Sequence, residues 1–282
     1  MSMGYDIEQS SLEKYERLKE LLLTKKELAV AFSAGVDSTF LLAAAHKLMG
    51  DKVIAITMHM NSATEKDINA AKLFCQKAGI TQIVIPFPEL DIEGFAENPP
   101  DRCYICKKAL FTRMQLVAAQ NGISCVAEGS NADDSHEIRP GMRALQELGI
   151  FSPLMEIGFT KEEIRFLSKE MELPTWDKKS QACLSSRIPY GERITEEKLR
   201  AVERSEQLIR DLGFDTVRVR VHGNIARIET DPEDFEKLLR VGIRERIDET
   251  LKRFGFTYVT LDLTGYRTGS LNEGIGEKTF ER

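Results

Sequence analysis

The feature that most limits the fold of this chain is an alternation of short apolar runs with helix-length stretches. Apolar runs at residues 28–32, 53–58, 81–87 and 123–129 alternate with helical patterns at 39–50, 64–78 and 104–121, after an opening amphipathic helix at 11–23. Short strands joined by helices of this length are typical of βαβ units and a parallel sheet. Because such crossovers are right-handed, the pattern predicts an α/β fold, a doubly wound parallel sheet with helices on both faces.

The pattern changes near residue 195. A helical stretch at 194–214 leads to two strand patterns, at 215–221 and 224–230, which a His-Gly-Asn turn joins into a hairpin. A helical stretch at 232–254 and a strand at 256–263 follow. We therefore predict an α/β domain at residues 1–194 and a smaller α+β domain, for substrate binding or oligomerisation, at residues 195–282.

Composition and charge narrow the class of function. No apolar run approaches the ~20 residues needed to cross a bilayer, and the first residues are not those of a signal peptide. We therefore expect a cytoplasmic protein that does not associate with membranes. The net charge is -6, from 39 basic and 45 acidic residues. This balance disfavours a large nucleic-acid partner, since basic residues supply most of the affinity for phosphates, and we expect none.

Residues 33–39, SAGVDST, lie between an apolar run and a helical pattern. Gly35 would let the backbone approach an anion, and a helix N-terminus would offer N–H groups and a favourable dipole. Ser33, Ser38 and Thr39 add hydroxyl donors, while Asp37 suits such a site if it binds magnesium or orients the loop. An isolated cluster of these residue types is more often a helix cap. The spacing is not that of a GxxxxGK[ST] loop, whose lysine is absent.

Cys103 and Cys106 form a C-x-x-C at the predicted start of a helix. The helix dipole and the neighbouring Lys107 and Lys108 favour thiolates there. Cys183 lies in SQACLSSRIPYG, which the Ser, Gly and Pro content predicts to be a loop. These three cysteines are candidates for chemistry.

Three interpretations of the C-x-x-C remain open on spacing alone. Structural zinc usually needs four ligands and only one such pair is present, while a dithiol redox pair gives Cys183 no task. Three cysteines also suit a 4Fe-4S cluster with one iron that lacks a protein ligand. Cys75 and Cys125 lie in helix and strand patterns, so we predict that they pack as small buried side chains. The odd total of five cysteines argues against a disulfide framework.

Together these segments resemble the LarE family of PP-loop sulfur transferases, which act in biosynthesis of the nickel-pincer nucleotide cofactor of lactate racemase. The loop SAGVDST resembles the SGGxDS loop of PP-loop ATP pyrophosphatases, with Ala34 in place of the first glycine. The resemblance runs over nearly the whole chain. It also rests on the segments NPPDRCYICKKALF, EIRPGMRAL, WDKKSQACLSSRIPYG, RDLGFDTVRVRVHGNIARIE and FTYVTLDLTGYRTGSLNE.

The resemblance implies that the chain transfers AMP from ATP rather than the γ-phosphoryl group. The family adenylates a carboxylate of pyridinium-3,5-biscarboxylic acid mononucleotide and replaces AMP with sulfur to leave a thiocarboxylate. The ATP-binding residues implied here are Ser33, Ala34, Gly35, Asp37, Ser38 and Thr39, with Mg²⁺ on Asp37.

Two versions of sulfur supply are associated with the family. One sacrifices a cysteine sulfur and leaves dehydroalanine, and the other uses a three-cysteine 4Fe-4S cluster. The C-x-x-C with Cys183 resembles the cluster version, with Cys103, Cys106 and Cys183 as ligands. Cys183 is thus implied to be catalytic, as a ligand or as the carrier of a persulfide, and the donor is expected to be sulfide or a persulfide.

The resemblance also carries over residues near the substrate. Ser186 and Arg187 resemble family positions near the adenylate and the substrate. Glu206 resembles an acidic, catalytic site residue that holds magnesium or orients the substrate. The expected partner is thus a small-molecule mononucleotide, and we also expect a homo-oligomer.

Arg218 and Arg220 are two residues apart on a predicted strand, so both side chains should point to one face. Two guanidiniums that converge in this way are suited to the phosphate of the mononucleotide. The alternative is an exposed strand face on which they pair with acidic neighbours such as Glu229.

Three other functions compete with this prediction. A tRNA thiolase of the cytidine-2-thiolation type also combines a PP-loop with a C-x-x-C and a later cysteine, but its substrate demands an extended basic surface. An amide-forming PP-loop ligase has no use for three loop cysteines. A non-catalytic nucleotide- or redox-sensing module would release no pyrophosphate with any candidate substrate.

Overall fold

The structure, a computed structural model, describes residues 2–136, 140–179, 182–267 and 269–270. Parts of three motifs of the family resemblance lie outside the described residues, namely residues 137–139, 180–181, 268 and 271–273. The chain forms two compact units. The first contains Met1–Pro88 and Cys103–Gln181, and the second contains Glu89–Arg102 and Ala182–Arg282.

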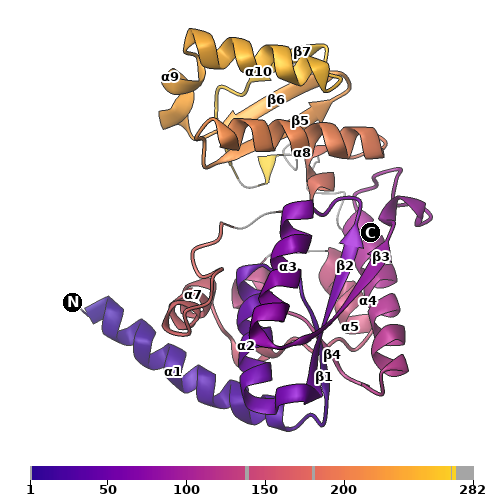
Figure 1. The fold of residues 1–282 in the computed structure, drawn as a ribbon, viewed down its shortest axis with the longest axis vertical. Coiled ribbons are helices and arrows are strands. Elements are labelled where there is room, and N and C mark those ends of the chain that lie inside the picture. Colours follow the sequence, from indigo (N-terminus) through magenta and orange to yellow (C-terminus); the bar gives the residue numbers. More distant parts are fainter. Residues whose placement is uncertain (1, 137–139, 180–181, 268, 271–282) are drawn as a thin grey trace. The chain divides into compact units, whose positions relative to one another are not determined.

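The first unit is built on a four-stranded parallel sheet. Its strands are β1 (Leu28–Ala31), β2 (Val53–Met60), β3 (Thr81–Phe87) and β4 (Val126–Ala127), in the order β3-β2-β1-β4 (Figure 1). The chain moves outward from β1 to β3 and then crosses back to place β4 on the other side of β1. This reversal creates a topological switch point beside β1, where open α/β sheets bind ligands at the carboxyl ends of their strands. The parallel sheet confirms the predicted α/β fold.

Helices cover both faces of this sheet. They are α1 (Ser2–Leu23), α2 (Val36–Met49), α3 (Glu65–Ala78), α4 (Arg102–Gln120), α5 (Pro140–Glu147), α6 (Pro153–Ile157) and α7 (Lys161–Glu170). On one face, Val30 packs in a core with Phe40 of α2 and Leu167 of α7. On the other, Ile56 packs with Phe111 of α4 and Leu145 of α5. No helix within the described residues is long and apolar enough to cross a membrane.

Local signals explain where these helices begin and end. Thr64 caps α3 by accepting a hydrogen bond from the backbone of Asp67 at 3.1 Å, and Gly79 ends the helix in a left-handed conformation with φ 68°. Thr160 and Glu163 form a reciprocal capping box at the start of α7. Because of this box, α7 presents Lys161 as its first residue.

The second unit is the smaller α+β part of the chain. It contains α8 (Glu196–Asp211), α9 (Phe235–Leu238), α10 (Val241–Arg253) and a three-stranded sheet of β5 (Val217–His222), β6 (Ile225–Thr230) and β7 (Tyr258–Leu261). The predicted hairpin is β5 and β6, which pair antiparallel, and β7 adds to β6 in parallel. The helical stretch predicted at 232–254 is divided, because α9 ends at Leu238 and α10 begins at Val241.

The two units divide the chain differently from the boundary predicted at 194/195. Residues 89–102 belong to the second unit because Asn98 is fully buried there. Its amide donates to the backbone carbonyls of Ile188 at 3.1 Å, Pro189 at 2.7 Å and Glu192 at 3.1 Å. Its oxygen accepts a hydrogen bond from Arg102. Asn98 therefore provides hydrogen-bond donors for backbone carbonyls of the segment that leads into α8. The predicted division into two functional domains at 194/195 stays a prediction.

Candidate functional site

The loop Ser33–Gly35 connects β1 to α2 in the first unit. Gly35 is the N-cap of α2, with an extended backbone at φ -82°, and no described side chain caps the helix. An uncapped helix start leaves N–H groups unsatisfied and carries a partial positive charge. The sequence predicted this arrangement, and it suits an anion such as pyrophosphate.

The hydroxyl groups of the loop play different parts. The Oγ atoms of Ser33 and Ser38 lie 3.1 Å apart, and Ser38 Oγ also lies 3.4 Å from the backbone N of Ser33. Thr39 is fully buried, and its Oγ1 donates to the carbonyl of Gly35 at 2.7 Å. Thr39 thus stabilises the first turn of α2 from the buried side of the helix. Ser33 in the loop and Ser38 in the first turn of α2 place their hydroxyl groups next to each other.

Ala34 has a left-handed backbone conformation with φ 54°. A residue with a Cβ is disfavoured there by about 1–2 kcal/mol, while glycine is not. Glycine at the first position of the SGGxDS pattern can therefore adopt this left-handed conformation without strain. With Ala34 at that position, the backbone of the loop is strained.

Asp37 stands in the first turn of α2. One carboxylate oxygen, Oδ2, forms an ion pair with Lys161 from the start of α7. The other, Oδ1, is buried and has no hydrogen-bond partner among the described residues. Burial raises the pKa of Asp37, Lys161 and the side chain of Asn131 oppose this effect, and the nearby Asp134 adds to it. A buried carboxylate oxygen without a partner, beside a second carboxylate, fits the oxygen ligands that Mg²⁺ prefers.

The residues after β4 support this loop, and sequence analysis missed them. A Cβ on Gly129 would lie 3.0 Å from the backbone N of Ser38 and 3.1 Å from the carbonyl carbon of Asp37, so only glycine fits without displacing α2. The buried Glu128 accepts hydrogen bonds from the backbone and side chain of Ser130, at 2.9 and 2.7 Å, and from Ser152 at 2.5 Å. The sequence signal was the Glu-Gly pair that ends the apolar run at residues 123–129.

Cys103 and Cys106 lie three residues apart in the first turn of α4, so their side chains share one face of the helix. Cys103 is exposed and Cys106 is partly buried. Cys183 is exposed and precedes a short 3-10 helix, Leu184–Arg187, in the second unit. Within the described residues, no group of three or more His, Cys, Asp or Glu side chains is arranged to hold a metal ion. The cluster therefore stays a prediction.

In the second unit, Arg187 and Glu206 form a buried ion pair. Glu206 accepts from Arg187 Nε at 2.8 Å, from Arg210 at 2.6 Å and from the backbone of Val219 at 3.1 Å. Arg187 also donates to Ser186 Oγ at 2.9 Å. Burial alone would raise the pKa of Glu206, but Arg187 and Arg210 together hold it below the usual range. This geometry favours an orienting role for Glu206 over magnesium binding.

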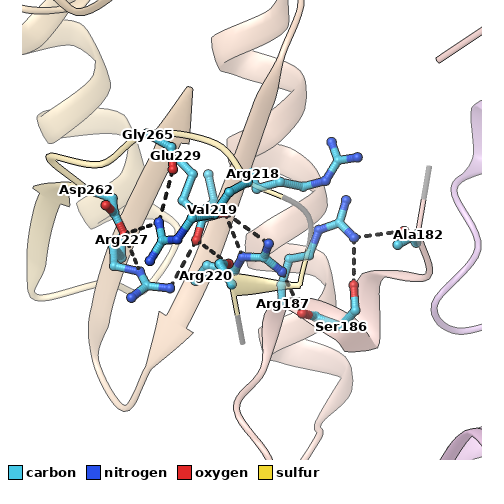
Figure 2. Close-up of polar contacts among 12 residues, drawn as sticks. Ala182, Ser186, Arg187, Arg218, Val219, Arg220, Arg227, Glu229, Asp262 and Gly265 are labelled. Atoms are coloured by element: carbon cyan, nitrogen blue, oxygen red, sulfur yellow. Dashed lines mark hydrogen bonds and ion pairs between the residues drawn. The ribbon is translucent and has the colours of Figure 1, made fainter. Parts of the chain in front are cut away.

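Arg218 and Arg220 lie on one face of β5, as predicted, but they are buried rather than exposed. Arg220 pairs with the buried Glu229 at 2.9 Å and donates to the carbonyl of Ser186 at 2.8 Å (Figure 2). The guanidinium of Arg218 lies 5.3 Å from the ring centre of Tyr266. Ser186, Arg187, Arg218 and Arg220 thus come together around one polar face of the second unit.

This polar face carries an excess of positive charge. Its arginine side chains outnumber its carboxylates. The arginines are Arg187, Arg210, Arg218, Arg220, Arg227 and Arg267, and the carboxylates are Glu206, Glu229 and Asp262. Burial and the neighbouring Arg187 lower the pKa of Arg218. An anionic group such as a phosphate would relieve this repulsion.

Comparisons with known proteins show the family of this chain. A family described as a PP-loop domain matches residues 7–153. A pyridinium-3,5-bisthiocarboxylic acid mononucleotide synthase of Lactiplantibacillus plantarum is 36% identical, over 89% of this chain and 90% of that protein. The chain belongs to the LarE family. Uncharacterised proteins of Synechocystis and Methanocaldococcus jannaschii are 40% and 30% identical, over 92% and 91% of this chain and 97% and 98% of theirs.

Membership of the LarE family confirms the resemblance that the sequence motifs indicated. The PP-loop domain makes this LarE-family chain an ATP-dependent enzyme, with the loop at the predicted position. The structure adds residues that sequence analysis did not assign, namely Gly129, Asp134, Lys161 and Lys178. Gly129 lies against the first turn of α2, Lys161 pairs with Asp37 and Lys178 donates to Ala34, while Asp134 acts on Asp37 through its charge. All four come from parts of the chain that are distant from the loop in sequence.

Proposed function

We propose that the chain is an ATP-dependent sulfur transferase that adenylates a carboxylate of pyridinium-3,5-biscarboxylic acid mononucleotide and converts it to a thiocarboxylate. The observation that carries this proposal is the uncapped start of α2 together with the buried Oδ1 of Asp37, which accepts no hydrogen bond within the described part of the chain. Similarity over most of the chain to a bisthiocarboxylic acid mononucleotide synthase supports the choice of substrate. The proposed compartment is the cytoplasm, which supplies ATP.

In the first step, a carboxylate oxygen of the substrate attacks the α-phosphorus of ATP, and pyrophosphate leaves. A carboxylate is a poor electrophile, and the mixed anhydride gives it a good leaving group. The backbone N–H of Gly35 and the hydroxyls of Ser33 and Ser38 would hold the departing pyrophosphate. Asp37 would ligate Mg²⁺, which neutralises charge on the leaving group when bound. Lys161 supplies a further positive charge beside Asp37.

The polar face of the second unit would hold the substrate. Arg218 and Arg220 are proposed to bind the phosphate of the mononucleotide, since paired guanidiniums match phosphate geometry. Glu206 is proposed as a positioning residue, because its carboxylate orients Arg187 through two hydrogen bonds of 2.8 and 3.2 Å. Ser186 stands beside them and is proposed to contact the adenylate.

In the second step, sulfur attacks the acyl carbon, the bond to AMP breaks, and a thiocarboxylate and AMP are formed. The proposed donor is hydrosulfide, which also releases a proton, or a persulfide. With a persulfide the first product is an acyl disulfide, and two thiols, which become a disulfide, must reduce its S–S bond to release the thiocarboxylate. We assign Cys103, Cys106 and Cys183 as ligands of a 4Fe-4S cluster. Two thiols on one helix face and a third that is exposed are compatible with this assignment. When bound, the cluster would supply sulfide at an iron without a protein ligand. A homo-oligomer is part of the proposal.

The decisive experiment supplies the anaerobically purified protein with Mg·ATP, the mononucleotide and sulfide. We expect pyrophosphate and AMP in equal amounts, together with a product in which sulfur replaces one oxygen. Absence of pyrophosphate with this substrate would contradict the proposed function.

Iron and acid-labile sulfide content tests the cluster separately. We expect about four irons and four sulfides per chain, and loss of both in Cys106→Ala. Cys75→Ala is the matched control, because Cys75 is buried in the core of the first unit. A metal-free protein after anaerobic reconstitution would refute the cluster and leave the adenylation step intact.

A further inference from the structure

Lys178 is a lysine to which the proposed mechanism gives no task. Its ammonium group reaches the phosphate loop, where Nζ donates to the backbone carbonyl of Ala34 at 2.9 Å. The same Nζ lies 2.8 Å from Oδ1 of Asp67, with which it forms an ion pair. Lys178 is more than 100 residues from the loop in sequence, so the fold alone brings them together.

Both ends of the Lys178 side chain are held in place. Arg165 of α7 donates to the carbonyl of Trp176 at 2.6 Å and to the carbonyl of Lys178 at 2.7 Å, which fixes the backbone. At the other end, Asp67 accepts a hydrogen bond from Thr64 Oγ1 at 2.7 Å. The ammonium group is therefore aimed at one acceptor on the loop.

The loop has a particular need for such a contact. Ala34 has φ 54°, a conformation that a residue with a Cβ adopts only when its surroundings hold it there. Because the peptide bond is planar and trans, the Ala34 carbonyl and the Gly35 N–H lie in one plane and point in opposite directions. A donor that holds the carbonyl on one side therefore directs the N–H to the other.

We propose that Lys178, held by Asp67, is a positioning residue that keeps the Ala34–Gly35 peptide in the orientation that binds pyrophosphate. The inference rests on the proposed ATP-cleaving function and adds a residue to it. Lys178 acts through the loop rather than by contact with the phosphates. Ala34 makes the loop depend on this lysine, since alanine does not favour the required conformation.

The test is equilibrium binding of Mg·pyrophosphate to the full-length chain by calorimetry. Lys178→Met should weaken binding about 10- to 100-fold, the size expected for a hydrogen bond with a charged donor. Lys178→Arg keeps a charged donor and should restore most of the affinity. Lys179→Met, which removes the same charge from the exposed neighbouring residue, should leave binding unchanged within about twofold. Circular dichroism checks that each variant is folded. Asp67→Asn removes the ion pair that holds Lys178 and should also weaken the binding of Mg·pyrophosphate.

The background Ala34→Gly separates positioning from direct attraction. Glycine adopts a positive φ without strain, so Lys178→Met should cost much less affinity there than in the wild type. An equal loss in both backgrounds would show that Lys178 binds phosphate directly and would overturn the positioning role. Unchanged binding in Lys178→Met, with normal binding in the wild type, would overturn the inference alone. A wild type that binds neither Mg·pyrophosphate nor Mg·ATP would overturn the proposed function and this inference with it.

Discussion

At the scale of single residues, the main feature of the second unit is a set of buried carboxylates paired with arginines. Glu206 and Glu229 are almost completely buried, and each accepts hydrogen bonds from two arginines. A buried carboxylate is costly unless it is paired, so removal of one partner leaves an uncompensated charge. The arginines of the polar face are therefore held rigidly before any substrate arrives.

Glu206→Gln should lower the free energy of unfolding of the second unit by about 3 kcal/mol at neutral pH, because it leaves Arg187 buried without its counter-ion. The pKa of Glu206 is below its ordinary value of 4.5, so its contribution is complete above that pH. The difference between variant and wild type should then shrink as the pH falls through the lowered pKa, where the carboxylate becomes protonated in the folded state as well. Urea unfolding at several pH values measures this. Glu236→Gln, at an exposed residue, is the control, and equal stability of Glu206→Gln and wild type at neutral pH would contradict the argument.

Thiol reactivity should follow burial. Burial raises the pKa of Cys75 to about 11, and the side chain is only 2% exposed, so it should resist alkylation in the native protein. Cys103 and Cys183 are exposed and should react first. Brief iodoacetamide treatment of the metal-free protein, followed by peptide mass mapping, gives the order. Early modification of Cys75 would show that the hydrophobic core around Cys75 in the first unit opens more readily than its packing indicates.

At the scale of elements, the phosphate loop is assembled from parts of the sequence that are far apart. The starts of α2 and α7, the end of β4 and the segment before Lys178 all meet around Asp37 and Ala34. The position of Lys161 depends on how α7 begins, since a cap fixes the first turn of a helix. Helix caps in this region therefore affect binding as well as stability.

Thr160→Ala should lower the free energy of unfolding by about 1 kcal/mol, because it removes the cap of α7. It should also weaken ATP binding, since the first residue of α7 is Lys161, the partner of Asp37. Thr195→Ala is the matched control, because Thr195 caps α8 in the second unit and its loss should affect stability alone. Thermal unfolding and ATP titration of both variants measure the two effects. An equal loss of ATP affinity in both would contradict the assigned route through Lys161.

Much of this arrangement could be predicted from sequence, and the rest depends on tertiary contacts. The alternation of apolar runs located the parallel sheet, and SAGVDST located the loop at the start of α2. The two-residue spacing of Arg218 and Arg220 gave their shared face but not their burial, which arises from the packing of the second unit. Lys161 and Lys178 carry no local signal, because each becomes significant only through a partner more than 100 residues away in the sequence.

At the scale of the whole molecule, the chain consists of two compact units, and we expect substitutions and ligands to change the stability of each unit separately. The phosphate loop belongs to the first unit, and the polar face with its arginines belongs to the second unit. A ligand that binds the folded state of one unit raises the stability of that unit. The second unit depends on residues 89–102, where Asn98 holds three backbone carbonyls.

Asn98→Ala should lower the stability of the second unit by about 2–4 kcal/mol, because it leaves buried carbonyl groups without their donor. Mg·pyrophosphate should instead raise the melting temperature of the first unit. Differential scanning calorimetry of the full chain, with and without this ligand, measures both shifts. Asn121→Ala, which removes an amide bonded to one carbonyl within the first unit, is the control. If Asn98→Ala and the ligand shift the same transition, the assignment of residues 89–102 to the second unit is wrong.

The discontinuous second unit also sets an order of events during synthesis. Asn98 is made 90 residues before its partner Ile188. At about 5–20 residues per second, roughly 5–20 s separate the two on the ribosome. During that interval the strands of the parallel sheet have all been made, while the segment around Asn98 waits for the rest of its unit. The loop residues and Lys178 are therefore made before Arg218 and Arg220, so the nascent chain completes its nucleotide site while the polar face of the second unit is still unfinished.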